Sequence, residues 1–167
     1  MDFESKIISR QIGDILYASG YTIGTAESCT GGRISEAIIA IPGSSDYYKG
    51  GVVAYTDEVK EKLLGVSHEV IEKNTAVSEE VAREMVLGTI NTIGVDFAIA
   101  STGVAGPGGG TAEHPVGTIW LAYGNKDEVR TFKLTEDYGR DINLAIATNK
   151  AIRLMLDFLN DMDIKSE

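Results

Sequence analysis

Residues Tyr21-Thr-Ile-Gly-Thr-Ala26 and Glu27-Ser28-Cys29-Thr30-Gly31-Gly32 follow one another near the start of the chain. The first six form a short β-prone run, and the two glycines interrupt it. Apolar residues at helical spacing come next and end at Pro42-Gly43, which is typical of a helix with a clear stop. This order predicts a strand, a tight turn and a helix.

Helices and strands are expected to alternate along the rest of the chain. Helical patterns cover residues 8–19, 56–64, 67–71, 78–94 and 142–159, and β-prone runs cover 51–55, 95–101, 118–123 and 128–134. The run 51–55 is expected to be a buried strand. The last helix is expected to bury one stripe of residues: Ile142, Ala145, Asn149, Ile152, Leu156 and Leu159. Alternation of this kind predicts one α/β domain over residues 1–167, a three-layer α/β/α sandwich with a mixed, mostly parallel sheet.

Charge and composition narrow the classes of function. A formal net charge of −10 and the lack of a basic stripe argue against a nucleic-acid partner. No apolar run is long enough to cross a membrane. Because Cys29 is the only cysteine, no intrachain disulfide can form, and a reducing, cytoplasmic location is expected.

Ser28 is the first candidate for chemistry because it lies where a strand hands over to a helix. Ligands bind at such places in open α/β sheets, and the glycines that follow leave room for a ligand to approach the backbone. Alternatively, Ser28 or Thr30 only caps the helix. Cys29 is a rival nucleophile, although a small buried hydrophobe is the more frequent role of a lone cysteine.

A serine nucleophile needs a base. Neither His68 nor His114 has a sequence context that suggests a Ser-His-Asp triad. A lysine with a pKa lowered by burial is the alternative. Tyr55 is expected at the end of a strand and Lys60 one turn into the helix that follows, so both could face one cavity. Lys62 competes with Lys60 for this role, and both lysines could equally be surface residues.

A glycine-rich loop and an arginine complete the set of candidates. Residues Ser101-Thr-Gly-Val-Ala-Gly106-Pro-Gly-Gly-Gly110 follow an apolar strand and could supply N–H donors to an anion, or could simply connect two elements. Arg140 opens the last helix and could bind a phosphate, or could pair with Asp141 on the surface. No metal-binding spacing of Cys or His is present, so a metal-free site is expected.

Taken together, these segments resemble the C-terminal domain family of the competence/damage-inducible protein CinA. The likeness runs in order from about residue 12 to residue 159. It is carried by Thr25-Ala-Glu-Ser-Cys-Thr-Gly-Gly32, Pro42-Gly-Ser-Ser45, Gly51-Val-Val-Ala-Tyr55, Lys60, Leu64-Gly-Val66, Ala76-Val-Ser78, Ser101-Thr-Gly-Val-Ala-Gly106-Pro107 and Pro115-Val-Gly-Thr118. The resemblance implies a stand-alone form of a domain that longer relatives join to a second, N-terminal domain.

The resemblance also implies an activity, since characterised members of the family are nicotinamide-nucleotide amidases. The expected reaction is hydrolysis of nicotinamide mononucleotide to nicotinate mononucleotide and ammonia, with no cofactor. The family's nucleophile corresponds to Ser28, its lysine to Lys60 and its tyrosine, expected to aid the lysine, to Tyr55. The substrate-binding residues are expected to be Thr30, Gly31, Gly32, Thr102, Gly103 and Arg140, with the phosphate resting on the 30–32 helix start.

Two other functions stay open on the sequence alone. One is a nucleotide-binding or interaction module without catalysis, because family membership does not guarantee activity. The other is an amidase for a related carboxamide. The expected partner is a small-molecule nucleotide substrate, with no nucleic acid and no membrane, and a homodimer or other homo-oligomer is a further expectation.

Overall fold

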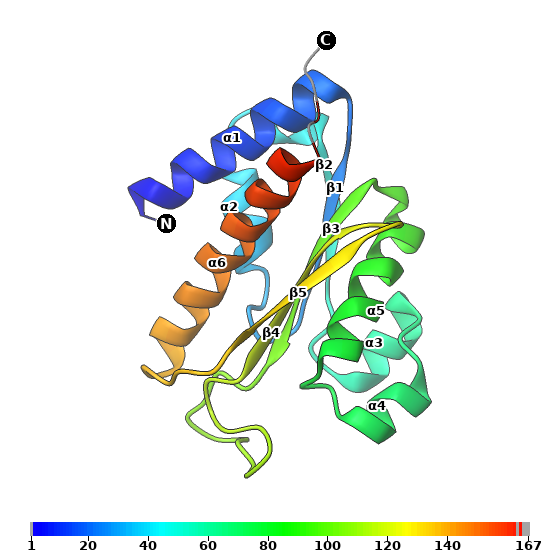
Figure 1. Ribbon diagram of the computed structural model, residues 1–167, viewed down its shortest axis with the longest axis vertical. Coiled ribbons are helices and arrows are strands. Elements are labelled where there is room, and N and C mark those ends of the chain that lie inside the picture. The colour runs from blue at the N-terminus through cyan, green and yellow to red at the C-terminus, as the bar shows by residue number, and fades with distance from the viewer. Residues whose placement is uncertain (1, 163, 165–167) are drawn as a thin grey trace.

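The protein has a five-stranded mixed sheet at its centre (Figure 1). The computed structural model describes residues 2–162 and 164. Its strands are β1 (Ile23–Glu27), β2 (Tyr48–Val53), β3 (Phe97–Gly103), β4 (Ile119–Asn125) and β5 (Val129–Leu134), in the spatial order β2-β1-β3-β4-β5. β1 pairs in parallel with β2 and β3, whereas β4 is antiparallel to both of its neighbours. The mixed, mostly parallel sheet predicted from the sequence is therefore confirmed.

Helices cover both faces of this sheet (Figure 1). α1 (Phe3–Ser19), α2 (Arg33–Ile39) and α6 (Arg140–Asp161) lie on one face, and α3 (Asp57–Leu64), α4 (His68–Asn74) and α5 (Glu79–Thr89) lie on the other. Two short turns, 3-10 at Ser44–Asp46 and π-helical at Ile90–Gly94, complete the elements. Three layers are thus present, as the alternating pattern predicts.

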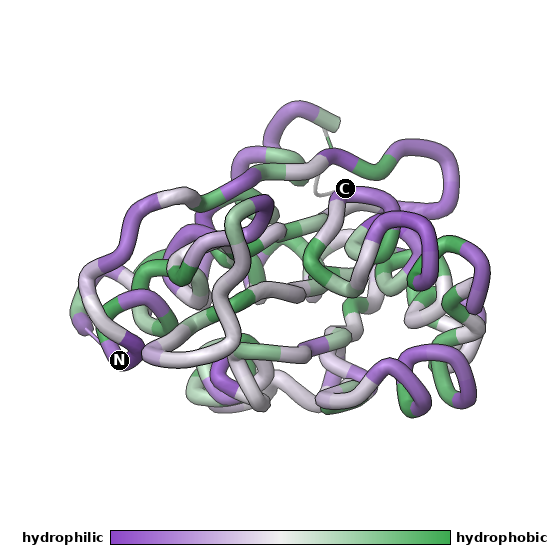
Figure 2. Tube along the Cα trace, turned by 90° about the horizontal axis from the view of Figure 1, so that it is seen from below, coloured by the Kyte–Doolittle hydropathy of each residue, from purple (hydrophilic) through white to green (hydrophobic). Residues whose placement is uncertain are grey.

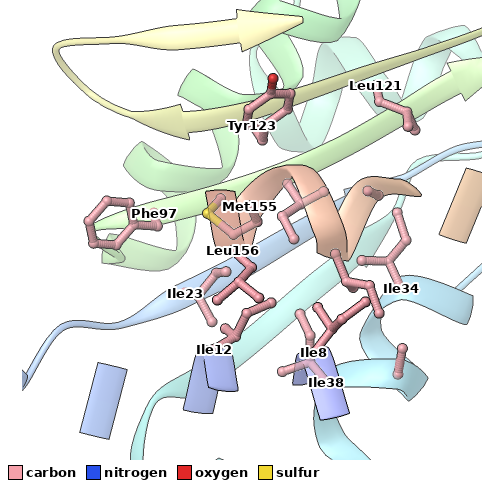
Figure 3. Packing of buried hydrophobic residues seen from close by; sticks show 14 of the residues in the cluster. Ile8, Ile12, Ile23, Ile34, Ile38, Phe97, Leu121, Tyr123, Met155 and Leu156 are labelled. Atoms are coloured by element: carbon pink, nitrogen blue, oxygen red, sulfur yellow. The ribbon is translucent and has the colours of Figure 1, made fainter. Parts of the chain in front are cut away.

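Each face of the sheet buries its own hydrophobic cluster. Ile12 of α1, Ile23 of β1 and Met155 and Leu156 of α6 meet on one side (Figure 3). Small side chains, among them Ala26, and the apolar face of α5 fill the other side. Figure 2 shows hydrophobic segments in the middle of the molecule and hydrophilic turns around it. Successive side chains of a strand point to opposite faces. Because every residue of β1 is buried, its side chains enter the two helical layers alternately.

Strand β2 differs from the buried strand expected at 51–55. It begins earlier, at Tyr48, ends at Val53, and alternates between partly buried and exposed residues. The reason is its position at the edge of the sheet, where β1 is its neighbour on one side only. Tyr55 therefore lies beyond the end of the strand.

The buried stripe of α6 also differs from the expectation at its first half. Ile142 is 54% exposed and Ala145 is exposed, whereas Asn143, Leu144 and Ala147 are buried. The predicted stripe is correct at Ile152, Leu156 and Leu159, which are buried. The buried stripe is shifted because α6 packs against α1 and α2 as well as against β3 and β4. Small residues such as Ala147 are therefore buried in its first half.

Among the described residues, no helix combines the length and the apolar character that crossing a membrane requires.

Candidate active site

The nucleophile candidate Ser28 directly follows β1, at the end of the sheet where the carboxyl ends of the parallel strands lie. Glu27 ends β1 opposite Ser101 of β3, and the Ser28 N–H donates to the Ser101 carbonyl at 2.9 Å. The loop after β3 reaches the same end of the molecule as the start of α6 (Figure 1). The fold therefore places the 28–32 turn, the glycine-rich loop and Arg140 in one region.

Lys60 reaches Ser28 from the neighbouring helix. The Thr56 side chain caps α3 by accepting from the Val59 N–H, and this cap sets Lys60 one turn into the helix. The Lys60 Nζ donates to the Ser28 Oγ at 3.0 Å. Both side chains are secluded, since Lys60 is 2% exposed and Ser28 is 8% exposed. The structure thus brings together the serine and the lysine that the sequence singles out.

Burial sets the protonation state of this lysine. Loss of solvent lowers the pKa of Lys60 below its ordinary value of 10.5, and the nearby Asp57 carboxylate opposes the effect. The Asp57 Oδ1 lies 3.8 Å from the Lys60 Nζ, but Asp57 is 55% exposed, so water screens it. A lysine of this kind holds a larger fraction of neutral amine near neutral pH, which is what a general base requires.

The other candidate bases lie elsewhere. Lys62 is exposed, and His68 is 66% exposed and held between Glu61 and Glu72. His114 lies in the glycine-rich loop and does not line the cavity that contains Ser28. Lys60 is therefore the base that the geometry favours.

The rival nucleophile Cys29 is held in its unreactive form. Burial raises the pKa of its thiol to about 11, so the thiolate needed for attack is scarce near neutral pH.

Replacement of Cys29 with Ala is accordingly expected to leave turnover nearly unchanged. A steady-state assay of the variant, with a thermal melt as the control for packing, checks this result. A loss of turnover without a loss of stability would mean that the thiol takes part in the chemistry.

A cavity of about 240 Å³ opens beside Ser28. Its lining consists of the serine turn, Tyr55, the glycine-rich loop and the start of α6: Ser28, Cys29, Tyr55, Gly103, Val104, Ala105, Gly106, Gly108, Gly109 and Arg140. A larger hollow of about 630 Å³ between α1, α2 and α6 is lined by neither Ser28 nor Lys60. The smaller cavity is therefore the candidate active site.

Arg140 bridges two walls of this cavity. Its guanidinium donates to the Gly106 carbonyl at 2.9 Å and to the Tyr55 hydroxyl at 3.4 Å. Tyr55 is 60% exposed, and its hydroxyl bonds to Arg140 rather than to Lys60. Tyr55 thus lies at the mouth of the cavity, beyond the end of β2, and its expected help to Lys60 stays a prediction.

The first turn of α2, which follows residues 30–32, binds an internal carboxylate. The Glu27 carboxylate accepts from the Ile34 and Ser35 N–H groups at 2.8 and 3.0 Å. It also accepts from the hydroxyl of Thr30, which is 2% exposed. The carboxylate thus takes up two N–H groups that lie beyond residues 30–32. Thr30, Gly31 and Gly32 do not line the cavity beside Ser28, so the phosphate site expected there stays a prediction.

Of the two substrate-binding residues expected at the end of β3, only Gly103 lines the cavity. Thr102 is 1% exposed and donates to the Ala76 carbonyl at 2.7 Å, so its hydroxyl secures the loop before α5 and does not face the cavity. Gly103 lines the cavity. A Cβ there would lie 2.5 Å from the Thr118 carbonyl oxygen. The backbone just before β4 therefore leaves room only for glycine at position 103.

Two residues that sequence reasoning missed support the site. Glu27 is one, because an acidic residue at a strand end gives no sign that it will cap the next helix. Asn143 is the other: it is 3% exposed and donates to the Ala105 carbonyl at 3.1 Å and to Asp137 at 2.9 Å. Asn143 lies outside the apolar stripe that the sequence predicts for this helix, so no pattern in the sequence indicated it. Across residues 2–162 and 164, no cluster of three His, Cys, Asp or Glu could hold a metal ion.

Comparison with known proteins identifies a family and a fold. The family model described as "CinA C-terminal domain" matches residues 5–159. A solved structure of the competence/damage inducible protein CihA from Agrobacterium tumefaciens superposes with a TM-score of 0.92 at 35% identity, over 96% of this chain and 98% of that one.

Curated relatives fall into two length classes. A "CinA-like protein" of Amoebophilus asiaticus is 39% identical over 92% of this chain but only 37% of its own length. The chain thus spans about a third of the longer relatives. A protein of Enterobacter agglomerans named "Nicotinamide-nucleotide amidohydrolase PncC" is 48% identical over 72% of this chain and 73% of its own length. On the family match and these identities, the chain belongs to the CinA C-terminal domain family.

Proposed function

We propose that this chain is an amidohydrolase that converts nicotinamide mononucleotide to nicotinate mononucleotide and ammonia, with Ser28 as nucleophile and Lys60 as base. The observation that carries the proposal is the 3.0 Å contact between the Lys60 Nζ and the Ser28 Oγ at the edge of a cavity. The Enterobacter agglomerans relative named for this activity supports the choice of substrate.

The reaction is an acyl transfer in two halves. The neutral Lys60 amine takes the Ser28 hydroxyl proton while the Ser28 oxygen attacks the carboxamide carbon. Backbone N–H groups at Cys29 and at residues 105–106, which line the cavity, are the proposed donors to the oxyanion, and one such donor is typically worth about 3 kcal/mol. Lys60 then gives its proton to the departing ammonia. Water releases the nicotinate mononucleotide by the reverse sequence of proton transfers.

Arg140 is the proposed partner of the substrate phosphate. Arg140 lines the cavity and lies at its mouth between Tyr55 and Gly106, whereas residues 30–32 do not line it. A guanidinium presents a fork of donors that matches phosphate oxygens. The ring would then enter toward Ser28 and the phosphate would stay near the opening.

The rival function, a nucleotide-binding module without catalysis, gives no reason for a buried lysine beside a serine. Burying an amine costs free energy, and a binding module would gain nothing from placing it out of reach of solvent. A related carboxamide remains the second candidate substrate, because the cavity admits an amide beside Ser28 whatever the rest of the molecule.

A substrate panel tests the proposal. Ammonia release is measured from nicotinamide mononucleotide, free nicotinamide and the dinucleotide, with the unchanged chain and with Arg140→Ala. The mononucleotide is expected to be the preferred substrate. Arg140→Ala is expected to raise KM for the mononucleotide by about 10- to 100-fold, as loss of a charge-assisted contact worth 1.5–3 kcal/mol implies, and to leave KM for free nicotinamide unchanged.

Tight binding of the mononucleotide without release of ammonia would favour the binding module. Faster release from another carboxamide would move the assignment to that substrate.

A further inference from the structure

Glu27 is a fully buried carboxylate that the proposed reaction does not use. It is 0% exposed, and among the described residues it forms no ion pair with a lysine or arginine. Four hydrogen bonds satisfy it instead, from the Thr30 hydroxyl, the Ile34 N–H, and the N–H and hydroxyl of Ser35. A buried charge is costly unless it is fully bonded, and a neutral cap such as Ser or Asn would serve the helix alone.

A chain of short contacts leads from this carboxylate to the nucleophile. The Thr30 Oγ1 lies 2.7 Å from the Glu27 Oε1 and 2.7 Å from the Ser101 Oγ. The Ser101 carbonyl accepts from the Ser28 N–H at 2.9 Å, and the Ser28 carbonyl accepts from the Gly31 N–H at 3.1 Å. The Ser28 N–H is therefore held by a residue of this network, and the Ser28 carbonyl is held within the 28–31 turn.

The carboxylate also fixes the direction of the hydrogen bonds. Because an ionised carboxylate can only accept, the single Thr30 proton goes to Glu27, and the Thr30 oxygen must accept from the Ser101 hydroxyl. Each hydroxyl thus has one defined orientation, which holds the 28–31 turn against β3. Neither Glu27, Thr30 nor Ser101 lines the cavity, so the network touches no substrate.

We propose that Glu27 is a positioning residue: its carboxylate, acting through Thr30 and Ser101, holds the turn that presents Ser28 to Lys60. The inference rests on the proposed function, because it assumes that Ser28 is the nucleophile. It places the effect in the chemical step rather than in substrate binding, since the network lies behind the turn.

The test compares two variants, each of which removes one hydroxyl group that donates to the Glu27 carboxylate. Thr30→Val cuts the link toward Ser101 and the nucleophile, whereas Ser35→Ala removes a bond on the helix side. For both, kcat and KM for ammonia release are measured together with the rate at which a fluorophosphonate labels Ser28 and with the melting temperature. Thr30→Val is expected to lower kcat and the labelling rate by about 10- to 100-fold, since small misplacements of a reacting group have effects of this size. KM should be unchanged, and Ser35→Ala should change neither rate.

Equal losses in the two variants, in step with lost stability, would overturn the proposal, and so would an unimpaired Thr30→Val. If Thr30→Val does not fold, Ser101→Ala cuts the same link, because its backbone carbonyl still holds the Ser28 N–H, and the same two outcomes apply. The labelling rate keeps the two claims apart. An unchanged chain that releases no ammonia refutes the proposed function, while the labelling comparison still decides the role of Glu27.

Discussion

Replacement of Ser28 with Ala is expected to lower kcat for ammonia release by about 10⁴- to 10⁶-fold, a loss of the size that removal of a serine nucleophile causes. The reason is that Ser28 carries the hydroxyl that the Lys60 amine contacts. The neighbouring Cys29 cannot replace it, because burial raises the pKa of that thiol to about 11. Ammonia release gives the rate, and calorimetric titration with nicotinamide mononucleotide shows whether the variant still binds substrate.

Ser9→Ala is the matched control for this experiment. Ser9 is 1% exposed, lies on α1 and lines no part of the cavity, so its loss should leave kcat unchanged. A Ser28→Ala variant that retained normal turnover would remove serine from the mechanism.

Replacement of Lys60 with Met is expected to lower kcat/KM by about 10²- to 10⁴-fold, the usual contribution of a general base. Methionine keeps the volume and the apolar stem of lysine but has no amine to take the Ser28 proton. Substrate affinity should change little, because Lys60 faces Ser28 and does not line the cavity. Steady-state kinetics with the mononucleotide checks both parts.

The same replacement is expected to stabilise the folded protein at neutral pH. Burial lowers the pKa of Lys60 below its unfolded value of about 10.5. Folding at neutral pH therefore costs free energy, because the ammonium must either lose its proton or be buried with its charge. This penalty is present at neutral pH and disappears as the pH rises toward 10.5. The melting temperature of Lys60→Met should therefore exceed that of the unchanged chain near pH 7, by about 2–4 °C for each 1 kcal/mol gained, and the difference should shrink in alkali.

Lys62→Met provides the control, because Lys62 is exposed on the same helix. Neither its kinetics nor its melting temperature should change. Thermal melts at neutral and alkaline pH make the comparison, and a Lys60→Met variant that is less stable at neutral pH would contradict a buried, desolvated amine.

Local patterns in the sequence predict that Ser28 follows a strand and that Lys60 lies in a helix, and the family resemblance favoured Lys60 over Lys62. A strand followed by Gly31-Gly32 and a helix puts Ser28 at the carboxyl end of the sheet. The Thr56 cap sets the helical register of Lys60. Patterns of this kind depend only on residues that are close in sequence, so contacts between distant segments do not change them.

The remainder of the site depends on contacts between distant segments. Glu27 occupies the α2 start through residues seven and eight positions later, and Arg140 meets Tyr55 across 85 positions. The phase of α6 depends on its packing against α1 and α2 as well as against the sheet, which no periodicity within the helix records. The edge position of β2 likewise follows from the order of strands, and that order places Tyr55 at the mouth.

The central claim, that a neutral Lys60 activates Ser28, is tested most directly by the pH dependence of Ser28 labelling with a fluorophosphonate, from about pH 5 to about pH 10. We predict a rate that rises with pH along one titration whose midpoint lies below the ordinary lysine value of 10.5. In Asp57→Asn that midpoint should move to lower pH, because the Asp57 carboxylate 3.8 Å away raises the pKa of Lys60. A rate that does not vary with pH, or one with the same titration in Lys60→Met, would contradict the account.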